Sequence, residues 1–139
     1  MEYSKVHFKK IDFVFFNAGR IREAILEARF GRAEHNANGS GVGDPTAAQA
    51  MHKILPIKSV VIGGNRLEWP ESWIRVVDAV YSLCDERHLY VLAAKYGGEN
   101  YKRVCQRLHI AQSTHSKMWA EIRRYQELCA VQEGLIRIF

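Results

Sequence analysis

The residues of this sequence that could do chemistry are gathered in one stretch, between Lys95 and Arg124. Seven of the 20 lysines and arginines lie there, against two acidic residues, so the stretch carries a charge of +5. Residues 1–94 contain 12 basic and 11 acidic residues, and residues 125–139 contain one basic and two acidic residues. The net charge of +5 therefore lies in one segment, and a positive charge this local predicts a surface that binds a polyanion.

Tyr101–Arg124 is expected to form two short amphipathic helices joined by a turn near His109–Ala111. The second helix would bury one stripe and expose the opposite face, because side chains three and four positions apart share a face. The exposed face carries short polar and cationic side chains, which fit a major groove about 12 Å wide and can bond base edges. The candidates for base contact are Gln112, Ser113, Ser116 and Lys117.

Cationic side chains elsewhere in this helix pair are suited to the DNA backbone. On the first helix, Lys102, Arg103 and Arg107 would hold phosphates, which positions the protein without distinguishing sequences. Arg123 and Arg124, further along the second helix, complete the candidate DNA-binding set. Free backbone N–H groups at the start of the second helix would add another phosphate contact.

Other chemistries find little support in the sequence. No carboxylate pair, nucleophile–base set or metal triad rises above chance, so we expect neither an enzyme nor a cofactor. Cys105 and His109, with His115 nearby, could be metal ligands, but no CxxC accompanies them, and packed or solvated side chains are the favoured interpretation. Gly39–Gly43 lacks the Lys-Ser/Thr ending of a phosphate loop and is interpreted as a linker.

Composition places the chain among ordinary globular proteins. It has 139 residues, of which 47% are hydrophobic and 25% charged. No apolar run approaches the roughly 20 residues of a membrane span, and the first residues lack the pattern of a signal peptide. Three widely spaced cysteines, Cys84, Cys105 and Cys129, indicate thiols in a reducing compartment. We therefore expect a soluble protein of the cytoplasm.

The predicted fold is mainly α-helical. Residues 1–30 form an N-terminal helical segment in which Asn17 can cap a helix, and residues 31–45, rich in glycine and asparagine, form a flexible linker. Residues 46–69 contain a short helix, opened by Asp44-Pro45, and a β-hairpin around Gly63-Gly64-Asn65 that must pack on helices. Residues 70–139 form a bundle with the helix pair and a C-terminal tail.

Apolar residues at spacings of three and four predict four helices after Pro70. The second begins at Asp85 or Glu86, and Asn100 caps the third. Trp69 and Trp73 are interpreted as core residues, with a partner-binding patch as the alternative. The alternating tail Glu133–Phe139 favours a short strand that could pair with the hairpin. The inward positions are expected at Trp73, Ile74, Val77, Val80, Tyr81, Cys84, Leu89, Leu92, Ala93, Tyr96, Tyr101, Val104, Cys105, Leu108, His115, Met118, Trp119 and Ile122.

A known family shares features of these residues. Tyr101–Ile122 resembles the helix-turn-helix of promoter-binding region 4 of bacterial sigma factors, and the preceding AVYSLCDERHLYVLAAKYGGENY resembles the first half of that region, about 45 residues in all. GVGDPTAAQA followed by WPESWIRVVDAV is similar to phage-encoded late-gene activators and antiterminators, over about 95 residues. The resemblance implies a regulator in a bacterial host cell that binds double-stranded DNA and RNA polymerase, with a homodimer possible.

Three positions depart from the sigma-like pattern. His109 stands where a turn glycine is common, and Ala111 stands where a capping serine is expected. Ser113 could cap instead, which would move the helix start by two residues and remove Gln112 from the base-contacting set. His115 occupies an inward slot that is normally aliphatic.

Several functions remain open on the sequence alone. The leading hypothesis is a sequence-specific transcription regulator of phage or prophage type, acting as activator or antiterminator. A phage DNA-packaging protein, such as a small terminase subunit, is a second, although those usually place the DNA-binding motif first. A third is a module that binds polymerase without DNA. The basic helix pair could also be only a solvated face.

Overall fold

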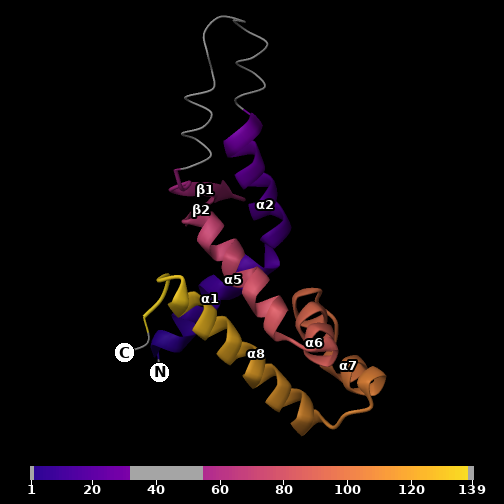
Figure 1. Cartoon of the computed structure of the whole chain (residues 1–139). Helices are drawn as coiled ribbons and strands as arrows, with labels where there is room; N and C mark the ends of the chain where they lie inside the picture. Colours follow the sequence, from indigo (N-terminus) through magenta and orange to yellow (C-terminus); the bar gives the residue numbers. More distant parts are fainter. Residues whose placement is uncertain (1, 32–54, 138–139) are drawn as a thin grey trace, which may run out of the picture. The chain divides into compact units, whose positions relative to one another are not determined.

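The computed structural model describes residues 2–31 and 55–137, and within them the chain is mainly helical with one small antiparallel sheet, as predicted (Figure 1). The linker after Gly31 and the short helix expected near residue 46 lie outside the described residues. The chain forms two compact units, Asn17–Ile74 and a second made of residues 1–16 and 75–139. Residues 1–16 thus group with the C-terminal helices.

The Asn17–Ile74 unit contains a helix and a hairpin. Helix α2 (Ala18–Leu26) continues into a π-helical turn, η1 (Glu27–Gly31). Asn17 occupies the predicted cap position, but its side chain makes no capping hydrogen bond. Strands β1 (Ser59–Ile62) and β2 (Asn65–Glu68) pair antiparallel, with Ile62 opposite Asn65. Gly63 and Gly64 have φ values of +54° and +83°, as a two-residue type I′ turn requires, and the predicted hairpin is confirmed.

Burial and an ion pair between Arg29 and Glu71 stabilise the described part of this unit. β1 packs on α2, as the prediction for the hairpin required. Arg29 pairs with Glu71 at 2.6 Å, and the same carboxylate accepts a hydrogen bond from the backbone N–H of Ile57. Trp73 is buried, as predicted, but Trp69 is 43% exposed. The backbone of Trp69 takes a left-handed conformation where the hairpin meets the next helix.

The second unit is helical. It contains α1 (Glu2–Phe16), the part of α5 (Pro70–Leu83) from Arg75 onward, α6 (Glu86–Tyr96), α7 (Tyr101–Leu108) and α8 (Gln112–Gln132). Asp85 caps α6 by accepting a hydrogen bond from the backbone N–H of His88 at 2.8 Å, so the predicted start is confirmed. The buried side chains of this unit are Ile11, Val14, Phe15, Val76, Val77, Val80, Val91, Leu92, Ala94, Val104, Met118, Ile122, Gln126, Cys129, Ala130 and Ile136.

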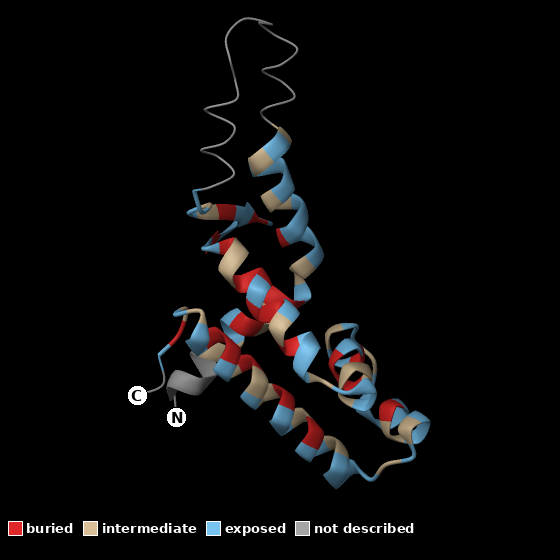
Figure 2. Cartoon of the chain, in the orientation of Figure 1, coloured by how far each residue is buried: buried red, intermediate tan, exposed pale blue. Residues whose placement is uncertain are grey.

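The apolar faces of the helices are turned slightly from the predicted ones (Figure 2). Val76 and Val91 are buried without having been predicted, whereas Ala93 is exposed. Tyr81 and Tyr101, both expected inside, are 41% and 40% exposed. A tyrosine can cover the core with one side of its ring and still present its hydroxyl to water.

A chain of hydrogen bonds connects α1, α6 and α8. The guanidinium of Arg123 donates to both carboxylate oxygens of Asp12, at 2.8 and 3.0 Å, and to Gln126 Oε1 at 3.0 Å. The Tyr96 hydroxyl donates to Asp12 at 2.7 Å and accepts from Gln126 Nε2 at 2.8 Å. Burial, followed by the hydrogen bond to Asp12, raises the pKa of Tyr96 well above its usual range, so the phenol keeps its proton.

The C-terminal tail differs from the prediction. Gly134 has a φ of +73°, and the N–H groups of Gly134 and Leu135 bond back to Val131 and Ala130 at 2.9 Å. This closure ends α8 and returns the chain towards the core, where Ile136 is buried. Residues 133–137 therefore form no strand, and the expected strand is wrong for this part of the tail.

Residues 2–31 and 55–137 include no helix that combines the length and the apolar character needed to cross a bilayer.

Candidate nucleic-acid interface

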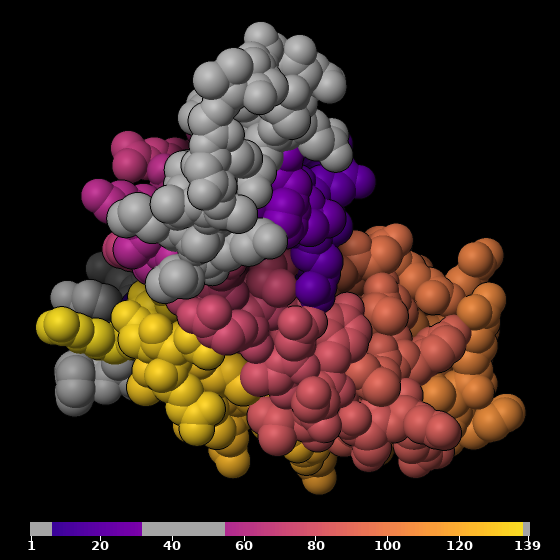
Figure 3. Space-filling model, turned by 45° about the horizontal axis from the view of Figure 1, so that its top comes forward, coloured from indigo at the N-terminus to yellow at the C-terminus, as the bar shows by residue number. Residues whose placement is uncertain are grey.

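Helices α6, α7 and α8 pack on one another and position the basic segment. The orange atoms in Figure 3, near residue 100 on the colour bar, lie at the surface. Asn100 caps α7 by accepting a hydrogen bond from the backbone N–H of Lys102 at 3.0 Å, as predicted. Arg87 donates to the carbonyl oxygen of Leu108 at 3.2 Å, so α6 satisfies an acceptor at the end of α7. Both ends of α7 are thereby held by side chains.

The turn between α7 and α8 depends on an unusual backbone conformation. His109 lies in the left-handed region at φ 54° and ψ 48°, and the N–H of Ile110 bonds to the carbonyl of Cys105 at 3.0 Å. A glycine adopts this conformation more readily, and the side chain costs roughly 1 kcal/mol. The prediction that a histidine fills the glycine position of this turn is confirmed.

The start of α8 settles which residues belong to its exposed face. Ala111 is the capping residue, with an extended backbone, and the first helical residue is Gln112. Ser113 does not cap, so the alternative start two residues later is wrong and Gln112 stays in the candidate set. The side chain of Ala111 cannot accept a hydrogen bond from the first N–H groups of α8. The missing cap costs about 1 kcal/mol relative to serine and leaves N–H donors at this end of the helix.

The structure brings eight of the nine candidate residues to the surface. On α7, Arg107 donates to the Tyr90 hydroxyl at 2.8 Å and lies 3.5 Å from the carboxylate of Glu99, while its side chain stays 62% exposed. Beyond Arg124 the outer side of α8 carries exposed Leu128, so its polar face covers only the first part of the helix. The exposed candidates are Lys102, Arg103, Arg107, Gln112, Ser113, Ser116, Lys117 and Arg124.

Arg123 is the exception among the candidates. Its guanidinium is bound to Asp12 and also lies over the rings of Phe8 and Trp119, 4.2 and 4.7 Å from their centroids. These contacts face the helices of its own unit, so Arg123 stabilises the fold and we leave it out of the interface. Its neighbour Arg124 is exposed and remains in it.

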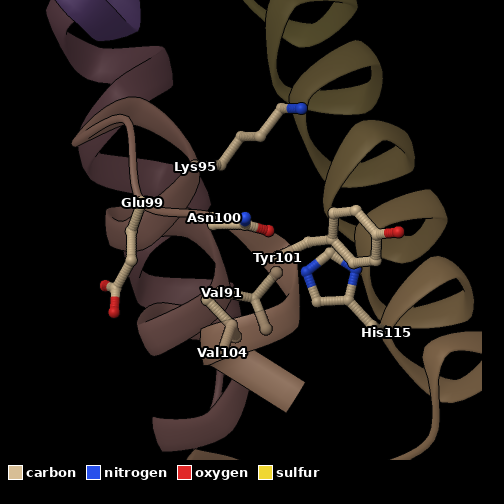
Figure 4. A pocket seen from close by; sticks show the side chains of 7 residues that line it. All are labelled: Val91, Lys95, Glu99, Asn100, Tyr101, Val104 and His115. Carbon is tan, nitrogen blue, oxygen red and sulfur yellow. The ribbon is translucent and has the colours of Figure 1, made fainter. Parts of the chain in front are cut away.

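Two hollows lie where α6 and α7 meet α8, and they add residues that the sequence did not single out. The smaller, about 230 Å³, includes Lys95, Glu99, Tyr101 and His115 in its lining (Figure 4). The larger, about 320 Å³, shares Lys95, Tyr101 and His115 with the smaller and extends along α8 from Gln112 to Trp119. Lys95 belongs to the basic segment of the sequence, but its position in the lining of both hollows depends on the packing of α6 against α8.

The half-buried His115 lines both hollows. Burial lowers its pKa, and the positive charge of Lys95 lowers it further. The imidazole is therefore neutral at pH 7. The centroid of its ring lies 6.0 Å from that of Tyr101, so the two side chains form an aromatic contact between α7 and α8.

A second histidine joins α6 to α8. His88 Nδ1 lies 2.8 Å from Asp85 Oδ1, and Nε2 lies 2.6 Å from Glu121 Oε2. Burial by itself lowers the pKa of His88, but the hydrogen bonds with Asp85 and Glu121 outweigh it, and the pKa is raised above 6.5. When it is protonated, the imidazolium links the start of α6 to Glu121 of α8.

The His88 linkage predicts a pH dependence of stability. Because the pKa is raised on folding, its contribution is fully present below pH 6.5 and is lost as pH rises through the folded-state pKa. Measured by urea unfolding, the free energy of unfolding of the wild type should fall between pH 6 and pH 8, whereas that of His88→Gln should not show this fall. In Glu121→Gln, which keeps Asp85 but loses one carboxylate, the fall should be smaller than in the wild type. Equal pH profiles for wild type and His88→Gln would rule this out. The pKa of Asp85 is lowered from 3.8, chiefly by the backbone hydrogen bond from His88, so its own change lies at acid pH.

Among the described residues, no three His, Cys, Asp or Glu side chains come together as a metal site. Cys84, Cys105 and Cys129 are free thiols. Burial raises the pKa of Cys84 and Cys129, so both stay protonated.

No protein-family model matches this chain, and neither a curated protein nor a solved structure is significantly similar to it.

Proposed function

We propose that α6–α8 form a DNA-binding helix-turn-helix and that the protein is a sequence-specific transcription regulator. The observation that carries the proposal is the exposed face of the first part of α8. It presents Gln112, Ser113, Ser116, Lys117 and Arg124, and none of them forms an ion pair with another described residue. From Gln112 to Arg124 this face extends about 18 Å, and a helix of this kind fits a major groove.

The two helices have different roles in this proposal. Lys102, Arg103 and Arg107 on α7 hold backbone phosphates, which orient the protein without distinguishing sequences. The side chains on α8 bond base edges. The N–H groups that Ala111 leaves uncapped at the start of α8 favour a phosphate there, because the N-terminal end of a helix attracts anions.

The proposed partners are RNA polymerase and a second copy of the chain. The resemblance of GVGDPTAAQA and WPESWIRVVDAV to phage late-gene regulators is the reason we propose action with RNA polymerase as an activator or antiterminator, in the cytoplasm of a bacterial host. One module with a few phosphate contacts binds DNA weakly. Tight occupancy of a site therefore requires RNA polymerase or a second copy of the chain.

Selection of bound duplexes from random sequences, at two salt concentrations, tests the proposal. A specific regulator enriches one sequence motif, and its binding weakens with salt in proportion to the phosphates held. Salt-sensitive binding without a motif favours a packaging or architectural protein. Binding to polymerase without binding to DNA favours the polymerase-interaction module.

Replacing Lys102 with alanine should weaken binding to every duplex by a similar factor. The reason is that a phosphate contact is independent of sequence, so the slope of log K against log salt should fall by about one unit. Fluorescence anisotropy titrations at several salt concentrations measure both quantities. Lys9→Ala removes an equally exposed lysine from α1 and should leave the slope unchanged. A loss confined to the selected motif would show that Lys102 contacts a base.

A further inference from the structure

The larger hollow has a lining suited to an anion. Its six lining residues include one cation, Lys95, and no carboxylate. Glu99 lines only the smaller hollow, and Figure 4 shows Lys95 pointing towards α8 while Glu99 points to the other side. Tyr101, Gln112 and Ser116, whose side chains can donate hydrogen bonds, also line this hollow.

The aromatic rings of this hollow are already engaged. Trp119 has the Lys95 ammonium 5.4 Å from its centroid and the Arg123 guanidinium 4.7 Å from it. Tyr101 and His115 contact each other at an angle of 47°. Stacking of a nucleobase needs an open ring face. A small anion needs only the ammonium and the hydrogen-bond donors, so it fits the hollow better than a base does.

We propose that this hollow holds one phosphate of the DNA backbone, with Lys95 and Tyr101 as binding residues. The inference rests on the proposed DNA-binding function and adds to it a phosphate contact centred on Lys95 of α6, with Tyr101 at the start of α7 beside it. Gln112 and Ser116 line the hollow and also belong to the candidate base-contacting set. The phosphate held here therefore belongs to a nucleotide at the edge of the sequence that α8 contacts.

The ring of Trp119 prepares Lys95 for this role. A lysine ammonium is attracted to the face of an indole, which favours the side-chain conformation that reaches the hollow. Less side-chain entropy is then lost when the phosphate arrives than for a freely rotating lysine. The position of Lys95 on α6 also means that the contact fixes the whole α6–α8 unit on the backbone.

Scanning the backbone charge of the DNA tests the proposal. The full chain is titrated with the selected duplex carrying a single methylphosphonate, which removes one negative charge, at each phosphate in turn. For wild-type protein, one position at the edge of the motif should weaken binding about threefold to tenfold. Lys95→Gln should bind the unmodified duplex more weakly than the wild type by the same factor. The methylphosphonate that weakens wild-type binding should lower the affinity of Lys95→Gln by less than twofold. Tyr101→Phe should show a smaller loss, of about twofold.

Lys9→Gln, the matched control, should keep the full wild-type response at every position. If Lys95→Gln binds the unmodified duplex as tightly as wild type, or still loses as much at each modified phosphate, the hollow holds no phosphate. In that case binding of wild type to the motif leaves the proposed function standing. If wild-type protein binds no duplex, the inference and the proposed function both fail.

Discussion

Replacing Arg123 with alanine is expected to lower the free energy of unfolding by about 2–3 kcal/mol, because it breaks a half-buried ion pair and leaves the Asp12 carboxylate without its cation. Among the described residues, Asp12 would keep the Tyr96 hydroxyl as its one donor after losing two hydrogen bonds from the guanidinium. Gln126, which is fully buried, would lose the donor to its Oε1. The rings of Phe8 and Trp119 would also lose the cation that covers them.

The adjacent Arg124 provides a matched control for this experiment. It is exposed, and the described residues give it no ion pair, so Arg124→Ala should change stability by less than about 0.5 kcal/mol. Urea unfolding measures both variants, and a double-mutant cycle with Asp12→Ala isolates the coupling between the two charges. If Arg123→Ala unfolds at the wild-type urea concentration, this chain of hydrogen bonds does not hold α1 on α6 and α8.

The effects of the two substitutions should be reversed when DNA affinity is measured instead of stability. Arg124 belongs to the exposed face of α8, so its loss should weaken DNA binding without unfolding the protein. Arg123 should weaken binding only to the extent that the protein is unfolded. The sequence suggested both as DNA contacts, because neighbouring arginines on one helix look equivalent until the partner of each is known.

Local signals predicted much of the fold. Asn100 caps the helix that it was expected to cap, α6 begins at Glu86 as one of the two expected starts, and Gly63-Gly64 makes the expected turn. Caps and tight turns depend on residues close together in the chain. Long-range packing was harder to predict. Asp12 and Arg123 are 111 positions apart, and nothing in the sequence near either residue identifies the other.

The buried faces were predicted in direction but not in detail. In α5 and α6, apolar residues occupy adjacent positions, so several stripes one residue apart fit the spacing equally well. The burial of Val76 and Val91, and the exposure of Ala93, depend on what packs against these helices. The same limit applies to the candidate interface, where Lys95 and Tyr101 gain their place only when α6 and α7 pack beside α8.

Replacing Gln112 or Lys117 with alanine is expected to change which DNA sequence the protein prefers. A glutamine amide can bond both N6 and N7 of adenine, and a lysine bonds O6 or N7 of guanine. Each lost contact should cost about 1–3 kcal/mol on the selected motif and almost nothing on other sequences. Repeating the selection with each variant should relax the preference at one position of the motif, and a different position for each variant.

Gln132→Ala is the matched control, since it removes an exposed glutamine from the far end of the same helix. Its selected motif should be that of the wild type. The comparison with Lys102→Ala separates the two kinds of contact, because a phosphate contact lowers affinity for all duplexes and leaves the motif intact. If Gln112→Ala and Lys117→Ala also weaken binding to all duplexes equally, α8 contacts only the backbone. The protein would then bind DNA without distinguishing its sequence, and regulation would depend on a partner that does.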